Sequence, residues 1–177
     1  MLSVRKNILL ALGLVSVSLL TGCNDGTSQA AVSSQAAASQ VVVPTVRLVL
    51  DVYKSPSCGC CGEWMKHLDS QGIGSVTHDL AELEASHARA VVPAQYRSCH
   101  TGVSSEGYVF EGHVPARYVK QFLNELPEGG VGLSVPGMPL GSPGMEQGDK
   151  FTPYKVFLLM NDGSSRVFAA VNTPAEQ

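Results

Sequence analysis

Three thiols lie within four residues in the stretch Ser55-Pro56-Ser57-Cys58-Gly59-Cys60-Cys61-Gly62-Glu63-Trp64, which directly follows an apolar run. Cys58 and Cys61 have the C-x-x-C spacing of a thiol–disulfide or metal site. Cys60 adds a third sulfur, which a simple redox pair does not need. The crowding of thiols therefore indicates metal chemistry at this point of the chain.

The residues on either side of the cysteines predict a strand followed by a helix. The alternation within residues 46–52 predicts a strand of mostly buried type, and Pro56 breaks it. Ser57 is a candidate N-cap for a helix that stops at Gln71-Gly72. The cysteines then lie in the first helical turn, where free backbone N–H groups and the helix dipole favour thiolates.

Further elements follow at short intervals. We expect a second strand over Ser75 to His78 and a second helix from a capping box at Asp79 and Glu82 to about Val92. A hairpin is predicted from residues 99–104 and 107–111. A third, amphipathic helix starts at Pro115 and has Val119, Phe122, Leu123 and Leu126 at helical spacing.

The order of strand, helix, strand, helix, hairpin and helix predicts an α/β fold with a thioredoxin-like core. The glycine- and proline-rich segment from Pro127 to Lys150 is predicted to be a loop without regular elements. Within that loop, Pro136-Gly137-Met138 is echoed by Pro143-Gly144-Met145. A C-terminal β-hairpin extension is expected, with its turn at Asn161-Asp162-Gly163.

The N-terminal residues have the features of an export signal. Basic residues precede an apolar run from Ile8 to Leu20, which is shorter than the roughly 20 residues of a membrane-spanning helix. The run ends at Leu20-Thr21-Gly22-Cys23, which is typical of a bacterial lipobox. We therefore predict a lipoprotein signal peptide over residues 1–22, with lipidation at Cys23, a flexible tether over 23–40 and one domain over 41–177.

The charge of the chain argues against some partners. The formal net charge is −3, and loss of the basic residues in the signal makes it more negative. Neither nucleic acid nor an anionic membrane surface is then an electrostatic partner, so a membrane contact is expected through the lipid anchor only.

Soft sulfur ligands suit Cu(I). On a regular helix Cys58 and Cys61 share a face and Cys60 points away, so bridging thiolates offer a way to hold several ions. Cys99 would begin the third strand, which in a thioredoxin-like core runs beside the strand that ends at the cysteine helix, and so would supply a fourth sulfur. Additional candidates for ligands or cover are His100, His113, Met138 and Met145, although His100 would point to the opposite face of a regular strand.

Three alternatives stay open at this point. The first is a pair of structural disulfides, which three crowded cysteines would form with little benefit to stability. The second is a thiol–disulfide oxidoreductase that uses Cys58 and Cys61. The third is a mononuclear zinc site of Cys58, Cys61, Cys99 and His100, which would leave Cys60 without a role. No catalytic residue is assigned.

Four ordered blocks carry a resemblance to a known family. They are Tyr53 to Gly62, Ser98 to Thr101, Glu111 to Pro115, and the two methionine segments Val135 to Pro139 and Gly141 to Glu146. With these blocks the chain resembles the CopG family of periplasmic copper-resistance proteins, over about Val46 to Val171.

The resemblance implies a thioredoxin-like fold with a multicopper thiolate site whose ligands are Cys58, Cys60, Cys61 and Cys99. The expected function is binding of several Cu(I) ions in copper resistance, by sequestration, handover or Cu(I)/Cu(II) interconversion, so a copper oxidoreductase activity is included. The expected location is the periplasm, with a lipid anchor in the inner or outer membrane. A periplasmic copper carrier or redox protein is the expected protein partner.

Overall fold

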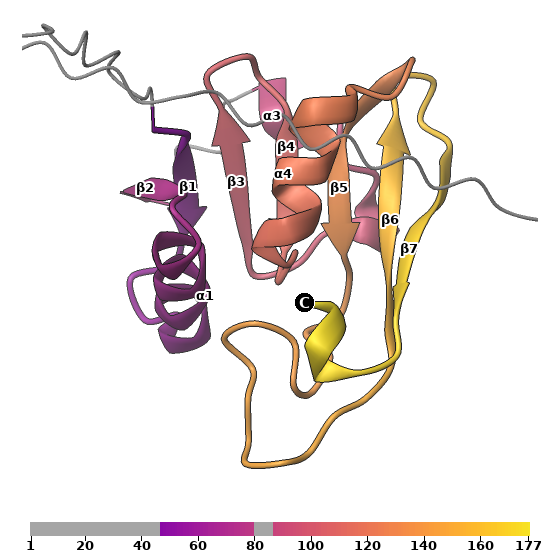
Figure 1. Cartoon of the computed structure of the whole chain (residues 1–177). Coiled ribbons are helices and arrows are strands. Elements are labelled where there is room, and N and C mark those ends of the chain that lie inside the picture. Colours follow the sequence, from indigo (N-terminus) through magenta and orange to yellow (C-terminus); the bar gives the residue numbers. More distant parts are fainter. Residues whose placement is uncertain (1–46, 80–86) are drawn as a thin grey trace, which may run out of the picture. The chain divides into compact units, whose positions relative to one another are not determined.

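The computed structural model describes residues 47–79 and 87–177 (Figure 1). The predicted signal peptide, the tether and Cys23 lie outside the described residues, as do residues 80–86 of the second predicted helix. The described residues belong to one compact unit, Val43–Gln177. Within them, no helix has the length and apolar character needed to cross a membrane.

The fold is a mixed α/β fold built on one seven-stranded sheet of order β2-β1-β3-β4-β5-β6-β7. The strands are β1 (Val49–Lys54), β2 (Gly74–Asp79), β3 (His100–Ser104), β4 (Val109–Gly112), β5 (Gly130–Val135), β6 (Tyr154–Met160) and β7 (Ser165–Val171). The helices are α1 (Gly59–Ser70), α3 (His87–Ala90) and α4 (Ala116–Glu125), with short 3-10 helices η1 (Ala94–Tyr96) and η2 (Pro174–Glu176).

Pairing among the first four strands places the start of β3 close to the start of the cysteine helix. Strand β1 pairs in parallel with β2, which α1 connects to it, and antiparallel with β3. Strand β3 forms the predicted hairpin with β4. Because β3 runs antiparallel to β1, the start of β3 lies beside the end of β1, where the cysteine helix begins.

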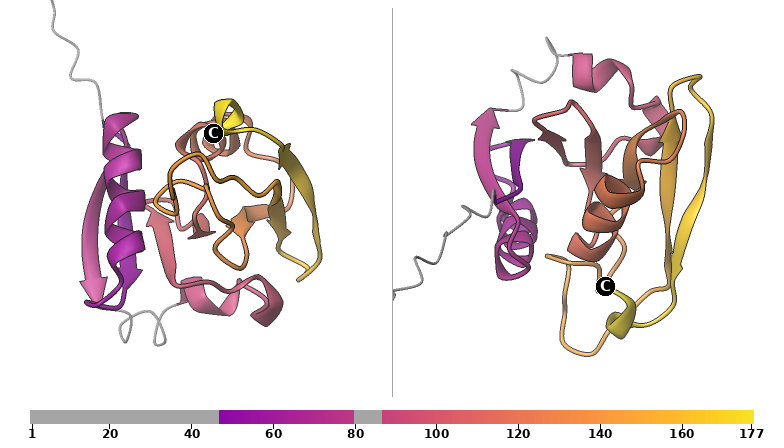
Figure 2. Two further views of the ribbon diagram at one scale, coloured as in Figure 1. Left: turned by 90° about the horizontal axis from the view of Figure 1, so that it is seen from below. Right: turned by 45° about the horizontal axis from the view of Figure 1, so that its top comes forward.

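Both faces of the sheet carry apolar side chains. On one face, Leu50 and Phe110 share a core with Trp64 of α1 and Phe122 of α4, so both helices cover that face. A smaller cluster on the other face includes Val109 and packs with residues near α3 and η1. Figure 2 shows α1 alongside β1 and β2, and α4 separately over the middle strands.

The structure corrects several details of the expected elements. In β1 buried and exposed residues alternate, so this strand is not buried on both faces. Cys58, not Ser57, is the N-cap of α1, and the Ser57 hydroxyl contacts that of Ser55 at 3.0 Å instead. Leu126 is the left-handed C-cap of α4 and is exposed, so it does not extend the buried face.

The larger correction concerns the segment from Pro127 to Lys150, which contains the regular strand β5. Strand β5 pairs in parallel with β4 and antiparallel with β6. Gly132 is required there because a Cβ atom would lie only 1.9 Å from the carbonyl oxygen of Val109. This glycine permits close strand packing, whereas the sequence pattern suggested a loop.

The rest of the C-terminal part agrees with the sequence pattern. Strands β6 and β7 form the expected antiparallel hairpin around Asn161-Asp162-Gly163. After β7 the chain returns to the long loop between β5 and β6 (Figure 1). There the Gln177 Nε2 group donates to the carbonyl oxygen of Gly141 at 2.7 Å.

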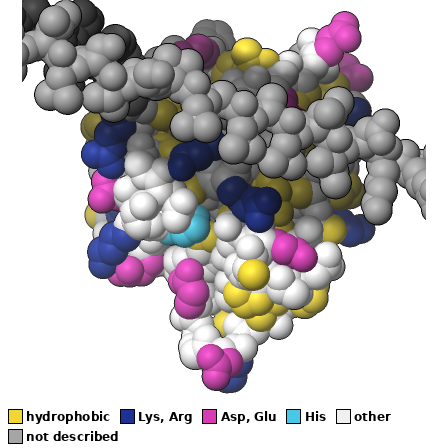
Figure 3. Space-filling view, in the orientation of Figure 1, with side chains coloured by type: hydrophobic (Ala, Val, Ile, Leu, Met, Phe, Trp, Pro, Cys, Tyr) yellow, Lys and Arg dark blue, Asp and Glu magenta, His cyan; other side chains and the backbone are white. Residues whose placement is uncertain are grey.

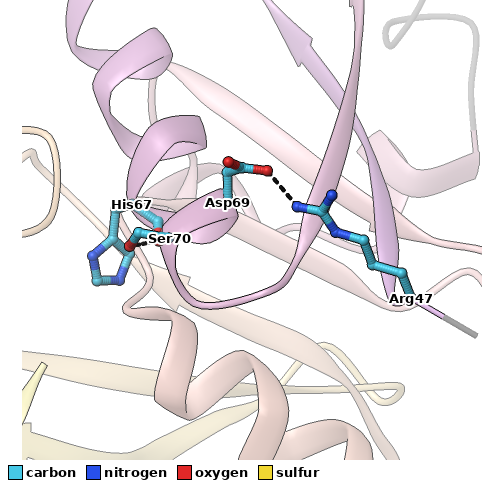
Figure 4. Close-up of polar contacts among 4 residues, drawn as sticks. All are labelled: Arg47, His67, Asp69 and Ser70. Atoms are coloured by element: carbon cyan, nitrogen blue, oxygen red, sulfur yellow. Dashed lines mark hydrogen bonds and ion pairs between the residues drawn. The ribbon is translucent and has the colours of Figure 1, made fainter. Parts of the chain in front are cut away.

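The C-terminal end of α1 makes polar contacts away from the cysteines. Asp69 forms an ion pair with Arg47, which precedes β1, and the Ser70 hydroxyl donates to the His67 carbonyl at 2.7 Å (Figure 4). The His67 ring points away from the Arg47–Asp69 pair. These contacts lie at the opposite end of α1 from the thiols.

Candidate metal centre

The N-terminus of α1 presents its thiols on a short, fixed turn. The N–H of Cys58 donates to the carbonyl oxygen of Ser55 at 3.0 Å, which closes the turn between β1 and α1. Cys58 is then the N-cap, and Cys60 and Cys61 lie in the first helical turn. The cysteines are therefore at the helix start, as predicted.

The structure brings together all four cysteines that the sequence singled out. The Sγ atoms of Cys58, Cys60, Cys61 and Cys99 all lie within 4.8 Å of one another. The Cys58 and Cys60 sulfurs are 3.7 Å apart, and the Cys61 and Cys99 sulfurs are 3.6 Å apart. Four sulfurs at such distances can share metal ions.

Two of these cysteines are bonded to each other. Cys58 and Cys61 form a disulfide, whereas Cys60 and Cys99 are free thiols. A disulfide sulfur is not a thiolate ligand, and adding two electrons and two protons returns two thiols. The four-thiol site is thus the reduced form of this cluster.

Two histidines extend the cluster on the side of Cys99. The Cys99 sulfur lies 3.3 Å from His100 Nδ1 and 3.6 Å from His113 Nε2. These three donors form a second group within 4.8 Å, and both histidines are buried. Cys99 therefore belongs to the four-sulfur group and to the sulfur–imidazole group at once.

Neighbouring residues on a regular strand point to opposite faces, but His100 does not point away from Cys99. Cys99 immediately precedes β3, which begins at His100, so the alternation of a regular strand does not hold across this pair. The His100 ring also packs against Trp64, with ring centroids 4.3 Å apart. This residue joins the site because the strand starts one position later than predicted.

His113 is held by the long loop. Its Nδ1 lies 2.8 Å from the carbonyl oxygen of Pro143, an atom that only accepts hydrogen bonds. Nδ1 therefore carries the proton, and in the neutral ring the Nε2 lone pair faces Cys99. Metal-binding histidines are commonly oriented by such a hydrogen bond at the other ring nitrogen.

Burial favours the uncharged forms of Cys99, His100 and His113. Burial raises the pKa of the Cys99 thiol to about 11, partly opposed by a hydrogen bond from Ser98. Burial and the neighbouring His113 lower the pKa of His100 to about 3, and burial also lowers the pKa of His113. At neutral pH both rings are free to donate a lone pair, and a metal ion must displace the Cys99 proton.

The loop after β5 packs directly on the cysteine helix. A Cβ atom at Gly144 would lie 2.7 Å from the Cys60 carbonyl oxygen and 2.6 Å from the backbone nitrogen of Trp64, so only glycine fits there. Met145 follows Gly144 and is half-buried, whereas Met138 is 44% exposed. The role of these methionines as ligands or cover stays a prediction.

Other features lie apart from the thiols. A groove of about 730 Å³ between α1 and β2 is lined by residues such as Lys54, Met65 and Thr77 and by none of the four cysteines. Figure 3 shows acidic and basic side chains interspersed on one face of the described surface.

Sequence reasoning missed two buried supports of the site. The carboxylate of Glu111 accepts hydrogen bonds from the residues on both sides of the Cys99-His100 pair, namely Ser98 and Thr101. Trp64 donates from Nε1 to the Val114 carbonyl oxygen at 2.8 Å. The available signal for Glu111 was a lone carboxylate next to the apolar residues Val109 and Phe110 in a short strand.

Comparison with known proteins places the chain in a family. Residues 96–145 match the family described as "Protein of unknown function, DUF411". Two solved structures named copper resistance protein CopG, Form 1 and Form 2, are each 42% identical to the chain with a TM-score of 0.64. The alignments cover 71% and 70% of this chain and 98% of each CopG chain. No curated protein matches the chain.

The fold and the donor set define a mixed α/β protein with a cysteine–histidine cluster capable of binding metal. The identity and coverage of the CopG structures make the relationship specific. The chain belongs to the CopG copper-resistance family.

Proposed function

We propose that this protein binds several Cu(I) ions at Cys58, Cys60, Cys61 and Cys99, with His113 and His100 as nitrogen donors. The observation that carries the proposal is the position of Cys99, whose sulfur belongs to both donor groups. A thiolate at that position can bridge ions held on either side. Thiolates and imidazoles are both suitable ligands for copper.

The residues of the chain have distinct parts in this site. Cys58 and Cys61 become ligands only after an external dithiol reduces their disulfide and is itself oxidised to a disulfide. Pro143 orients His113, and the loop at Gly144 covers the helix start beside Cys60. Binding of copper as cargo lowers free Cu(I) by sequestration, by handover, or by conversion to Cu(II), in which each Cu(I) ion passes one electron to an external redox protein.

We infer the setting of the site from the sequence and the topology. The lipobox at Cys23 supports a lipid-anchored protein of the bacterial periplasm, which receives copper from or passes it to a periplasmic carrier or redox protein. The strand order β2-β1-β3-β4, with α1 joining the parallel pair, supports a thioredoxin-like core extended by β5, β6 and β7.

The direct test is the amount of copper bound per chain. The protein is reduced without oxygen and titrated with Cu(I) against a competing chelator, in parallel with Cys60→Ser and with Zn²⁺ in place of copper. More than one tightly held Cu(I) per chain, and fewer in the variant, supports the proposal. Tight binding of one Zn²⁺ without retention of Cu(I) supports the zinc alternative, and binding of neither overturns the metal proposal.

The disulfide between Cys58 and Cys61 favours a second candidate, a thiol–disulfide oxidoreductase. In this reaction a reduced Cys58 thiolate attacks a substrate disulfide, and Cys61 then resolves the mixed disulfide, so the substrate gains two electrons. The raised pKa of Cys99 makes its thiol a poor third participant. Disulfide exchange by metal-free protein that survives Cys60→Ser, without copper retention, would favour this candidate.

A further inference from the structure

Cys99 requires external support because it does not lie within a regular element. It follows the 3-10 helix η1 by three residues and directly precedes β3. Its sulfur must nevertheless stay near Cys61 on one side and His113 on the other. The backbone around Cys99 therefore sets the geometry of both donor groups.

The carboxylate of Glu111 fastens that backbone on both sides. One oxygen accepts from the Ser98 N–H at 2.5 Å, and the other accepts from the Thr101 hydroxyl at 2.5 Å. Thr101 and Glu111 are also direct partners in the β3–β4 pairing. The two hydrogen bonds thus bracket Cys99 and His100, which lie between Ser98 and Thr101.

The same side chain connects the two segments that supply donors. Glu111 lies in β4, two residues before His113, whereas Ser98 belongs to the segment that supplies Cys99. Contact between the segments is close, because a Cβ at Gly112 would come within 2.9 Å of Ser98 Oγ. The distance between Cys99 and His113 therefore depends on how these two segments pack against each other.

Burying a carboxylate is costly unless hydrogen bonds compensate for its lost hydration. Glu111 is fully buried, and both of its oxygens are used. An apolar residue at this position would fill the core without fixing Ser98 or Thr101. The choice of a carboxylate is explained by its ability to hold two donors at a set separation.

We propose that Glu111 is a positioning residue of the metal centre, which fixes Cys99 between the cysteines of α1 and His113 through its hydrogen bonds to Ser98 and Thr101. This inference rests on the proposed function. Its two hydrogen bonds go to Ser98 and Thr101, the residues on either side of the Cys99–His100 pair, so its effect on metal is exerted through the position of Cys99. Outer residues that orient metal ligands typically change metal affinity by about 10- to 100-fold when removed.

The test compares Cu(I) affinity in the reduced full-length protein, Glu111→Gln and Thr101→Val, with Thr101→Ser as the conservative control. Glu111→Gln removes the charge and one acceptor, and Thr101→Val removes only the hydroxyl donor. We expect about a 10- to 100-fold weaker affinity in Glu111→Gln and a smaller loss in Thr101→Val. Thr101→Ser keeps the hydroxyl and should restore affinity to near the wild-type value.

A second readout separates positioning from general loss of stability. X-ray absorption of the copper-loaded proteins should show a changed balance of sulfur and nitrogen neighbours in Glu111→Gln and Thr101→Val. The core variant Val156→Ala, on β6, should lower the melting temperature but leave this balance and the affinity unchanged. If Glu111→Gln does not fold, Thr101→Val and Thr101→Ser decide the matter alone.

The outcomes distinguish this inference from the proposed function. Wild-type affinity and copper environment in both Glu111→Gln and Thr101→Val would overturn the positioning role while leaving copper binding intact. Equal losses in Thr101→Val and Thr101→Ser would also overturn it, because the hydroxyl would then be irrelevant. A wild-type protein that binds no Cu(I) overturns the proposed function and, with it, this inference.

Discussion

The Nδ1 atom of His113 lies 2.8 Å from the carbonyl oxygen of Pro143, a residue thirty positions later in the chain. This hydrogen bond fixes the tautomer of the neutral ring and turns Nε2 toward Cys99, 3.6 Å away. A loop residue without a functional side chain thus determines which nitrogen faces the thiols.

His113→Ala should weaken the binding of at least one Cu(I) ion by about 100-fold or more, because it removes a nitrogen donor together with the hydrogen bond to Pro143 that orients it. The measurement is competitive Cu(I) titration of the reduced protein, with the nitrogen contribution followed by X-ray absorption. His78→Ala is the control, since His78 contacts Asp51 and stacks on Tyr53, outside both donor groups. Equal Cu(I) affinities in wild type and His113→Ala would contradict the assignment.

Gly144→Ala should lift the loop from the helix start. The new methyl group would meet the backbone at Cys60 and Trp64, and the residue has a φ of +86°. We expect a loss of roughly 1–3 kcal/mol in the free energy of unfolding. Faster reaction of the reduced thiols with an aromatic disulfide reagent should accompany it.

Gly137→Ala is the matched control for this variant. Gly137 has almost the same φ, +85°, but a Cβ there would have no atom within 4 Å. Both variants should lose stability because alanine disfavours a positive φ, but only Gly144→Ala should expose the thiols. Equal thiol reactivity in the two variants would show that the loop does not cover the site.

The elements that the sequence predicted well are those with local signals. The cysteine helix and its stop at Gln71-Gly72 follow from spacing and capping, and the last hairpin follows from Asn161-Asp162-Gly163. Strand β5 was missed because Gly132 serves a contact with Val109, a residue distant in sequence. A pattern rule cannot distinguish such a glycine from a loop glycine.

In the candidate site, too, some residues could be predicted from the sequence and others could not. Cys58, Cys60 and Cys61 lie within four residues of the sequence, so their grouping was predictable, and Cys99 followed from the predicted strand order. The orientation of His100 depends on β3 beginning one residue late, which spacing does not reveal. Glu111 acts through two hydrogen bonds that exist only after β3 and β4 pair.

His67 should make the metal-free protein less stable in acid. Its Nε2 accepts a hydrogen bond from the N–H of Ala116 at 3.0 Å, and so caps α4, whose N-cap Pro115 has no capping side chain. Burial lowers the pKa of His67 below its ordinary value of 6.5, although Glu146 opposes the shift. The cap requires the neutral ring, so its stabilisation is present above pH 6.5 and is lost as the pH falls through the lowered folded-state pKa.

The effect is measurable as melting temperature against pH. Losing one such hydrogen bond costs about 1 kcal/mol, or roughly 4 °C for a domain of this size. His67→Gln keeps a neutral acceptor at every pH and should flatten the decline below pH 6.5. His100 and His113 also have lowered pKa values, so part of the decline should persist. An unchanged slope in His67→Gln would contradict the capping role.

Trp64→Phe should be among the costly substitutions in the described core. The indole of Trp64 is fully buried, donates to the Val114 carbonyl oxygen and packs against His100. Phenylalanine leaves that carbonyl without its donor and leaves a void beside the imidazole. We expect a loss of roughly 2–4 kcal/mol in the free energy of unfolding, measured by urea denaturation followed by circular dichroism.

The control for Trp64→Phe is Val167→Ala on β7, where the side chain is 49% exposed and the expected change is within about 0.5 kcal/mol. The unfolding experiment is best done on the reduced, metal-free protein, so that bound metal does not add to stability. A loss below about 1 kcal/mol in Trp64→Phe would mean that the Val114 carbonyl finds another donor. The packing of His100 beside Cys99 would then not depend on the indole.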